Sequence, residues 1–244
     1  MLNLTKDYQK ISQKLVDWIG DRITEAGCNG AVIGLSGGID SSVTSVLSKQ
    51  AVPENTLGII MPCYSSQEDI DDAKMLAEKF NIEQKVINLD NVFDEMLDTL
   101  SVEHDSKKLA VANIKPRLRM TVLYYYAAER NSLVVGTDNK SELKTGYFTK
   151  YGDGGIDIAP LGNLVKNEVK EVAKVLGIPE KIINRKPSAG LWAGQSDESE
   201  MGITYDQLDK YILTGEATDE VKKRADELMK KNAHKLKTPP IPKF

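Results

Sequence analysis

The stretch Ser-Gly-Gly-Ile-Asp-Ser-Ser at residues 36–42 combines residue types that bind phosphate with one that binds metals. It follows a short apolar run and precedes a helical pattern, and glycines and serines at such a turn present backbone N–H groups to an anion. The carboxylate of Asp40 would repel a phosphate unless a divalent cation lay between them. The stretch therefore predicts a polyphosphate site in which Asp40 binds Mg²⁺. The alternative is a tight turn in which Asp40 only complements the helix dipole.

The spacing of this stretch differs from that of two common nucleotide-binding loops. It is neither the G-x-x-x-x-G-K-[ST] loop of γ-phosphate transfer nor the G-x-G-x-x-G loop of dinucleotide redox enzymes. Mg²⁺ usually takes one or two carboxylates together with phosphate oxygens and water. Glu142, at the end of Gly-Thr-Asp-Asn-Lys-Ser-Glu (136–142), is the natural second carboxylate. A solvated loop glutamate is the alternative for this residue.

Alternating strand and helix patterns position both motifs. Short apolar runs separated by helical patterns lie at 31–35, 57–62, 84–89 and 132–137. This alternation predicts an α/β fold, a doubly wound parallel sheet of about five strands with helices on both faces. In such sheets ligands bind beyond the carboxyl ends of the strands. Because both motifs directly follow predicted strands, we expect them to share one crevice.

The composition is that of an ordinary soluble globular protein. The 244 residues are 41% hydrophobic and 28% charged, and the net charge of −4 argues against a nucleic-acid binder with a broad basic face. The two cysteines and two histidines lack zinc-finger spacing and make a disulfide framework implausible. Neither a signal peptide nor a membrane-spanning run is recognisable. We expect one cytoplasmic domain over residues 1–244, without repeats or a linker.

Motifs along nearly the whole chain resemble those of a known enzyme family. Residues 36–42 are similar to the SGGxDS pyrophosphate loop of the ATP-pyrophosphatase superfamily, whose fold is adenine nucleotide α-hydrolase-like. The other motifs resemble the ammonia-dependent NAD synthetases, in the order expected for that family. They are NIKPRLRM (113–120), GTDNKSE (136–142), GYFTKYGDGGIDIAPL (146–161), KPSAGLW (186–192), DESEMGITYDQLD (197–209) and HK (234–235). Pro116 departs from the family, which often has alanine there.

The resemblance implies an ATP-dependent amidation. The carboxylate of nicotinic acid adenine dinucleotide (deamido-NAD) attacks the α-phosphate of ATP to give an adenylate and pyrophosphate, and ammonia then displaces AMP to form NAD. Adenylation supplies the leaving group that a carboxylate lacks. The implied cofactor is Mg²⁺, and the implied partners are ATP, deamido-NAD and free ammonia. We expect no glutaminase domain, because the synthetase motifs occupy the chain.

The same resemblance implies roles for individual residues. Asp40 and Glu142 would bind the metal, and Asp40 and Lys166 would act in catalysis. The residues implied in ATP binding are Gly34, Leu35, Ser36, Gly37, Gly38, Ile39, Asp40, Ser41, Thr137, Lys166 and Ser188. Those implied in deamido-NAD binding are Arg117, Lys150, Asp157, His234 and Lys235. Without their motifs, Lys166 and Lys235 would be ordinary surface lysines, and His234 a helix-end histidine near the C-terminal dipole.

Two loops carry candidates for the ammonia site. Amidation is helped by a carboxylate that attracts ammonium or takes its proton. Asp153, in YGDGG, and Glu200, in DESEMG, lie in the loops 139–155 and 186–202. We expect these loops to close over the reacting group and exclude water. The alternatives are an aspartate that supports a glycine turn and a solvated acid in an acidic cluster.

We also expect a homodimer. The apolar stripe of the N-terminal helix and the aromatic run at 124–126 would supply surface for burial, and the resemblance strengthens this expectation. Packing within one chain is the alternative.

Two rival functions are considered. A tRNA-modifying enzyme can share the SGGxDS loop, but the acidic composition and the lack of a basic appendage disfavour it. A nucleotide-binding module without catalysis would not need both carboxylates and several cationic residues in one crevice. Release of AMP and pyrophosphate that depends on deamido-NAD distinguishes the synthetase from both rivals.

Overall fold

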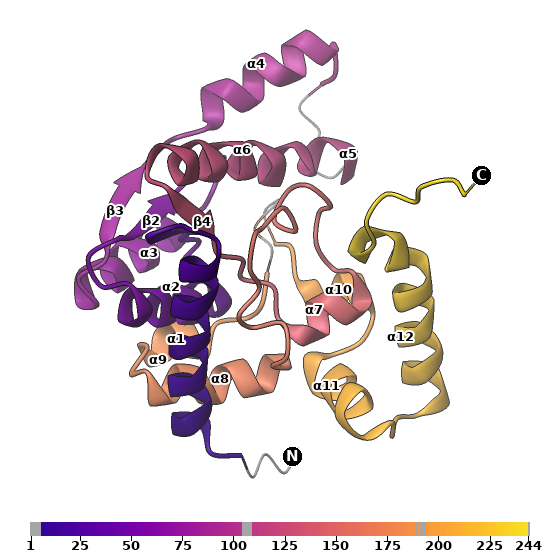
Figure 1. Ribbon diagram of the computed structural model, residues 1–244. Coiled ribbons are helices and arrows are strands. Elements are labelled where there is room, and N and C mark those ends of the chain that lie inside the picture. The colour runs from indigo at the N-terminus through magenta and orange to yellow at the C-terminus, as the bar shows by residue number, and fades with distance from the viewer. Residues whose placement is uncertain (1–5, 104–108, 189, 191–193, 244) are drawn as a thin grey trace.

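The computed structural model describes residues 6–103, 109–188, 190 and 194–243 (Figure 1). Its centre is a parallel sheet with the strand order β3-β2-β1-β4. The strands are β1 (Gly30–Gly34), β2 (Thr56–Ile60), β3 (Glu83–Val86) and β4 (Ser132–Val134). The predicted fold class is confirmed, with four strands in the described residues where the sequence predicts about five. Next to the end of β4, a single parallel bridge joins Val135 to Ile158.

The strand order brings the two predicted ligand motifs together. The chain runs from β1 through β2 to β3 and then returns to β4 on the other side of β1. The order therefore reverses between β1 and β4, and ligands of such sheets bind at this point. In the β1–β4 pair, Ala31 lies opposite Leu133 and Val32 lies opposite Val134. The segments that follow the two strands consequently begin side by side.

Helices cover both faces of the sheet. Since successive side chains of a strand point to opposite faces, each strand contributes to the core on either side. Ile33 and Leu35 join one core, whereas Val32 and Val134 join another (Figure 1). The helices of the first core are α1 (Tyr8–Glu25), α2 (Ile39–Ala51), α3 (Gln67–Lys79), α8 (Lys166–Val175) and α9 (Glu180–Ile183). Those of the second are α4 (Asp90–Leu100) and α6 (Ile114–Glu129), and α5 (Leu109–Ala112) precedes α6.

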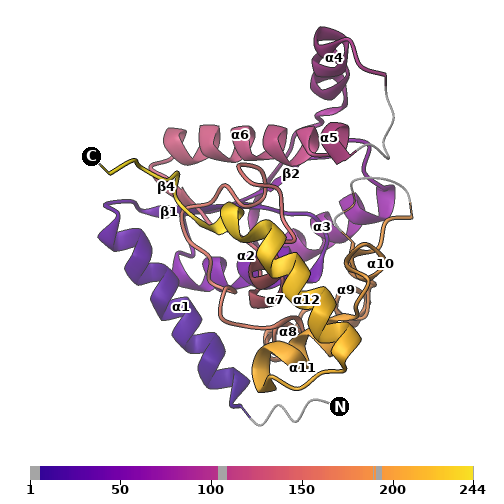
Figure 2. The same cartoon turned by 90° about the vertical axis from the view of Figure 1, so that its right-hand side faces the viewer.

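The C-terminal helices form a third, smaller core. Met201, Leu208 and Val221 are buried in it, and Tyr147 packs against it. Its helices are α10 (Asp197–Met201), α11 (Tyr205–Thr214) and α12 (Asp219–Asn232), followed by the 3₁₀ helix η1 (Ala233–Leu236). α12 contacts α7 (Lys140–Thr145), and Figures 1 and 2 both show the two helices side by side. This core therefore adjoins the segment that follows β4.

The N-terminal helix packs within the chain. Its apolar stripe, with Val16, Ile19 and Ile23, is buried in the first core, where α1 contacts α2 and α8. The sequence prediction of an amphipathic helix is confirmed, but this stripe is not free to form a dimer interface.

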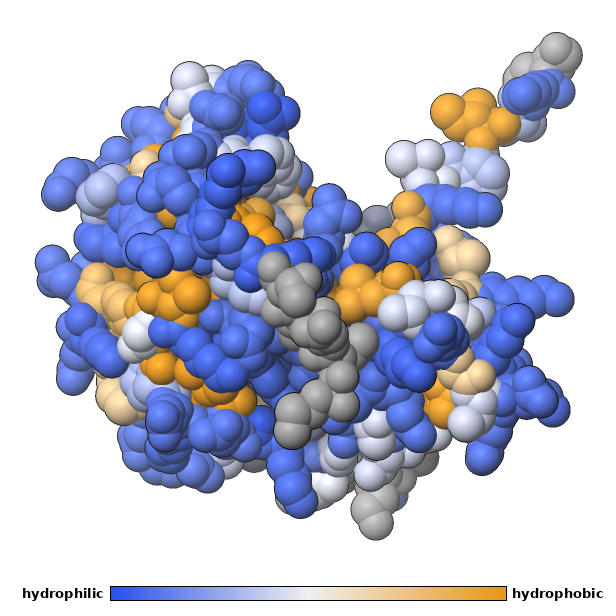
Figure 3. Space-filling model, turned by 90° about the horizontal axis from the view of Figure 1, so that it is seen from below, coloured by the Kyte–Doolittle hydropathy of each residue, from blue (hydrophilic) through white to orange (hydrophobic). Residues whose placement is uncertain are grey.

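The outer surface is largely hydrophilic in the view of Figure 3, where apolar residues form small groups among charged ones. The described residues include no helix that is both long enough and apolar enough to cross a bilayer.

Candidate active site

The predicted glycine turn connects β1 to α2. Gly37 has a φ of +78°, and a Cβ there would lie 2.4 Å from the carbonyl oxygen of Asp69, so the position requires glycine. The hydroxyls of Ser36 and Ser41 lie 2.9 Å apart, and Ser41 Oγ donates to the Gly38 carbonyl at 3.0 Å. The N-terminus of α2 follows directly, so the turn has the architecture of an anion-binding loop.

A buried lysine joins the two predicted metal-binding carboxylates. Lys166 Nζ forms an ion pair with Asp40 Oδ2, which is 126 residues away in the sequence, and lies 3.3 Å from Glu142 Oε1. The exposed fractions of the Lys166, Asp40 and Glu142 side chains are 4%, 16% and 13%. These three residues are called the Asp40–Lys166–Glu142 centre below. Its formation confirms that the two motifs share one site.

Local structure fixes the carboxylate of Glu142. Asn139 caps α7, and its side-chain oxygen accepts from the backbone N–H groups of Ser141 and Glu142. Glu142 Oε2 accepts from the Asn139 N–H in return, which is a capping box. Asn139 Nδ2 also donates to Asp40 Oδ1 at 3.0 Å. One asparagine thus orients both acids, and Glu142 Oε1 is left to face Lys166.

Burial and charge determine the protonation of the centre. Burial, with Asp40 nearby, raises the pKa of Glu142 to about 7 despite the opposing charge of Lys166. Burial alone would lower the pKa of Lys166, but the charges of Asp40 and Glu142 raise it well above its usual value. The lysine is therefore a permanent cation whose partner Asp40 lies next to the turn at 36–39. The two carboxylates supply the oxygen ligands that Mg²⁺ prefers, and both already contact the same cation.

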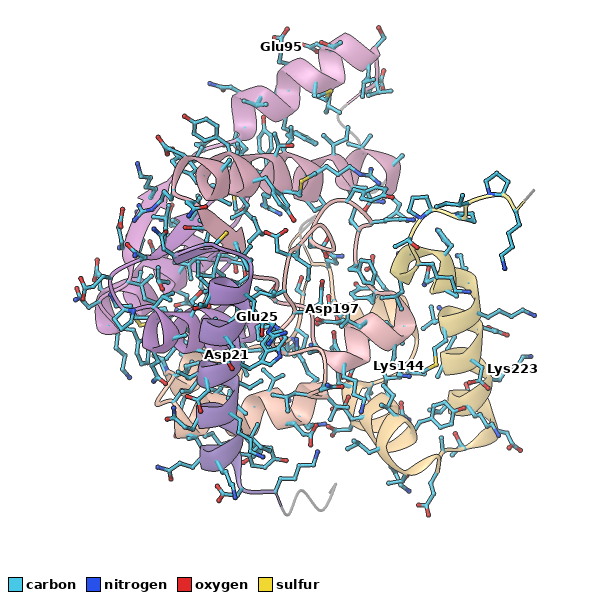
Figure 4. The ribbon with its side chains drawn as sticks, viewed as in Figure 1. Asp21, Glu25, Glu95, Lys144, Asp197 and Lys223 are labelled. Atoms are coloured by element: carbon cyan, nitrogen blue, oxygen red, sulfur yellow. The ribbon has the colours of Figure 1, made fainter. Side chains whose placement is uncertain are left out.

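Two tyrosines extend the centre to the acidic motif of α10. Tyr205 Oη donates to Glu142 Oε1 at 3.1 Å and lies 3.3 Å from Asp197 Oδ2. Tyr147 Oη lies 3.3 Å from Asp197 Oδ1 and donates to Glu200. Figure 4 shows Asp197 in the interior, near α7. The predicted residue Glu200, which is exposed, is therefore connected to the centre through three intervening side chains.

Sequence reasoning did not assign roles to the two tyrosines or to Asp197. Their signal is their position in GYFTKYGDGG and DESEMGITYDQLD, two motifs that resemble the family. It also gave no role to Asp138, which lies between Thr137 and Asn139 and is buried.

Four of the predicted deamido-NAD-binding residues lie where the loop after α7 meets the C-terminal helices. Lys235 Nζ donates to the carbonyls of Gly146 and Phe148, at 2.7 Å each. Lys150 Nζ donates to the His234 carbonyl at 3.1 Å, and Arg117 Nη2 donates to the Lys150 carbonyl at 3.3 Å. We call residues 146–155 with 232–236 the loop–tail region.

Other predicted residues occupy separate positions. Asp157 accepts from Tyr124 Oη at 2.9 Å and from the Val134 N–H at 2.8 Å, at the edge of the sheet. Asp153 accepts from the Thr149 N–H at 2.9 Å, as expected of an aspartate that supports a glycine turn. Ser188 Oγ accepts from the Gly190 N–H. Residues 189 and 191–193 of the predicted loop 186–202 lie outside the described residues.

Comparison with known proteins agrees with the motifs. A family model described as NAD synthase matches residues 11–239. The chain belongs to the NAD synthase family. An NH(3)-dependent NAD(+) synthetase of Carboxydothermus hydrogenoformans is 50% identical over 97% of this chain and 98% of that protein. One from Syntrophomonas wolfei is 48% identical over 93% of both.

Solved structures of similar sequence share the fold. An NMN synthetase from Francisella tularensis superimposes with a TM-score of 0.93 at 39% identity, covering 98% of this chain and all of that one. An NH3-dependent NAD synthetase from Campylobacter jejuni gives 0.81 at 33% identity, with the same coverage. The family resemblance recognised in the motifs is thereby confirmed.

Proposed function

We propose that this chain amidates deamido-NAD to NAD with ammonia, while ATP is converted to AMP and pyrophosphate. The observation that carries the proposal is the Asp40–Lys166–Glu142 centre, which lies beside an anion-binding turn where the strand order reverses. Two NH(3)-dependent NAD(+) synthetases that are 50% and 48% identical to this chain support the choice of reaction.

Different residues of the chain would act on different groups in the first step, the formation of the adenylate. The carboxylate oxygen of deamido-NAD attacks the α-phosphorus, the bond to the β-phosphate bridge breaks, and pyrophosphate leaves. The turn at 36–41 would hold the pyrophosphate on its N–H and hydroxyl groups, and Lys166 would neutralise its charge. Catalysis of this type depends mainly on position and charge. Thr137 and Ser188 would contact other parts of ATP.

We assign Mg²⁺ to Asp40 and Glu142. Their side chains are 16% and 13% exposed, Asn139 contacts both, and their oxygens suit this ion. When bound, Mg²⁺ would neutralise phosphate oxygens, which resolves the repulsion that Asp40 alone would cause.

In the second step, ammonia attacks the acyl carbon and the bond to AMP breaks. Arg117, Lys150, His234 and Lys235 would hold the dinucleotide, with Asp157 at the sheet edge. Asp153 and Glu200 are the proposed acids that attract ammonium or take its proton.

A second candidate substrate is the carboxylic acid precursor of NMN, because the solved NMN synthetase superimposes closely on this chain. Pyrophosphate release should be measured with ATP and Mg²⁺, with deamido-NAD or nicotinic acid mononucleotide, and without ammonium. Release that depends on deamido-NAD supports the first candidate, and release that depends only on the mononucleotide supports the second. Release with neither contradicts both, and a dependence on tRNA would indicate an RNA-modifying enzyme.

We further propose a cytoplasmic homodimer in which residues 1–244 form one domain. Both cysteines are free thiols, as is usual in a reducing compartment. The α4–α6 face keeps apolar side chains exposed, including Tyr125, Leu100 and Val92, and they could be buried by a second copy. Sedimentation at micromolar concentration tests the dimer, and a monomer alone would contradict it.

A further inference from the structure

The helix that begins with Lys166 has no N-cap side chain of its own. The residue before α8 is Val165, whose side chain cannot accept a hydrogen bond. The first N–H groups of an α-helix have no partner within the helix, so a buried helix start needs acceptors from elsewhere. Lys166 is buried. The start of α8 therefore depends on another part of the chain.

Asp209 of α11 supplies these acceptors. Its Oδ2 accepts from the Asn167 N–H at 2.8 Å and from Asn167 Nδ2 at 2.9 Å. Its Oδ1 accepts from the Ser141 hydroxyl at 2.5 Å, and Ser141 Oγ in turn accepts from the Lys166 N–H at 3.3 Å. The carboxylate thus caps the first two residues of α8, one through Ser141 and one directly.

No cation neutralises this carboxylate. Asp209 is 0% exposed, and none of the described lysines, arginines or histidines forms an ion pair with it. Burial raises the pKa of Asp209, and hydrogen bonds from Ser141 and Asn167 oppose that rise. The partial positive charge at the N-terminus of α8 also favours a carboxylate there. Its side chain is therefore held by the first turns of α7 and α8 alone.

These two turns carry Glu142 and Lys166. Glu142 directly follows Ser141 in α7, and Lys166 directly precedes Asn167 in α8. α11 contacts both helices, and Asp209 joins them at this level. Because Lys166 Nζ lies 3.3 Å from Glu142 Oε1, a shift of either turn would change the distance between cation and acid.

We propose that Asp209 is a positioning residue, which holds the first turns of α7 and α8 together and thereby places Lys166 against Glu142. The inference rests on the proposed amidation, in which Lys166 neutralises the charge of the departing pyrophosphate. No ion pair joins Asp209 to Lys166 Nζ, so its effect passes through the backbone of α8. Small displacements of a catalytic group lower reaction rates strongly.

The test is a double-mutant cycle between Asp209 and Lys166. Pyrophosphate release that depends on deamido-NAD is measured without ammonium in wild type, Asp209→Asn, Lys166→Met and the double variant. We expect Asp209→Asn to lower the rate constant at saturating substrate about tenfold, with the half-saturating deamido-NAD concentration changed by less than about twofold. In the Lys166→Met background the same substitution should lower the rate constant by less than about twofold, because the lysine that it positions is absent.

Asp206→Asn is the matched control. Asp206 lies on the same helix and accepts from the same Asn167 side chain, at 2.9 Å, but it is exposed and forms no hydrogen bond with the backbone of α8 among the described residues. It should leave the rate constant within about twofold of wild type. Equal losses from Asp206→Asn and Asp209→Asn would overturn the inference. An equal loss from Asp209→Asn with and without Lys166 would also overturn it, because Asp209 would then support the fold in general.

If Asp209→Asn does not fold, Ser141→Ala takes its place in the cycle. This variant removes the hydroxyl that links Asp209 to the Lys166 N–H, and it should lower the rate constant about fivefold only where Lys166 is present. No loss, or the same loss in the Lys166→Met background, would contradict the positioning role.

A binding measurement separates this inference from the proposed function. If wild type releases no pyrophosphate with deamido-NAD, the proposed function fails. Calorimetry with inorganic pyrophosphate and Mg²⁺ then tests the positioning role by itself. Asp209→Asn should weaken pyrophosphate binding about tenfold in the wild-type background and leave it unchanged in the Lys166→Met background. Equal weakening in both backgrounds, or none in either, would refute it.

Discussion

In the Asp40–Lys166–Glu142 centre, charged side chains contact one another, whereas in the loop–tail region, charged side chains contact backbone carbonyls. Lys166 is almost fully buried between two acids. Lys150 and Lys235 instead donate to the carbonyls of His234, Gly146 and Phe148, and no described acid forms an ion pair with either lysine. The centre is therefore organised before ligands arrive, while the lysines of the loop–tail region can exchange a carbonyl for an anionic ligand.

The difference predicts how substitutions should act. Removing a member of the centre leaves a buried charge unpaired and disturbs the step in which phosphate charge is neutralised. Removing a lysine of the loop–tail region weakens dinucleotide binding and loosens the loop, with less effect on adenylation at saturating substrate.

The largest effect is expected for Asp40→Asn. The substitution keeps the shape of the side chain and its hydrogen bond to Asn139 but removes the charge that faces Lys166 and the proposed Mg²⁺. We expect deamido-NAD-dependent pyrophosphate release to fall roughly 100-fold or more. The control is Asp71→Asn, an exposed acid on α3 that should retain full activity. Near-normal release by Asp40→Asn at ordinary Mg²⁺ concentration would refute the assignment.

A smaller, substrate-specific effect is expected for Lys235→Met. This change removes two charged hydrogen bonds to the loop at Gly146 and Phe148 and a proposed contact to deamido-NAD. The KM for deamido-NAD should rise about tenfold, with kcat changed much less, because the centre is untouched. Limited proteolysis should also cut more readily within 146–155.

Lys237→Met is the matched control for that experiment, because Lys237 is an exposed neighbour of the same tail. An equal effect of both substitutions would show that the tail's overall charge, and not the position of Lys235, governs binding.

Tyr205→Phe tests whether the Tyr205 hydroxyl holds Glu142 in position. The Tyr205 hydroxyl orients Glu142 at 3.1 Å, and its loss leaves the ring in place beneath Lys166. We expect about a fivefold increase in the Mg²⁺ concentration needed for half-maximal pyrophosphate release, in line with the loss of one hydrogen bond. Direct titration of the protein with Mn²⁺ should show the same weakening. Tyr211 is on the same helix as Tyr205, and Tyr211→Phe removes an exposed hydrogen bond to Asp226 of α12, so this control should change neither value.

The three residues of the centre were predicted from the sequence, but the side chains that hydrogen-bond to them were not. Asp40 and Glu142 lie in motifs that follow predicted strands, and the α/β alternation makes their meeting a consequence of sheet topology. Lys166 was assigned only through the family resemblance. The roles of Tyr205, Tyr147 and Asp197 depend on how α10 and α11 pack against α7, which no local pattern specifies. The stripe of α1 illustrates the same limit, because an amphipathic pattern predicts a buried face without identifying what covers it.

The smallest effect is expected for Glu200→Gln. Glu200 is exposed and accepts hydrogen bonds from Tyr147 and from Gln195, at 3.0 Å for the latter, so its charge is partly screened by solvent. If it attracts ammonium towards the site, the half-saturating ammonium concentration should rise about threefold, with pyrophosphate release without ammonium unchanged. High salt should erase this difference between variant and wild type, because an exposed charge acts through a screened field. An equal fall in the rates of adenylation and amidation would instead show that Glu200 acts by holding Tyr147 in the hydrogen-bond network of the centre.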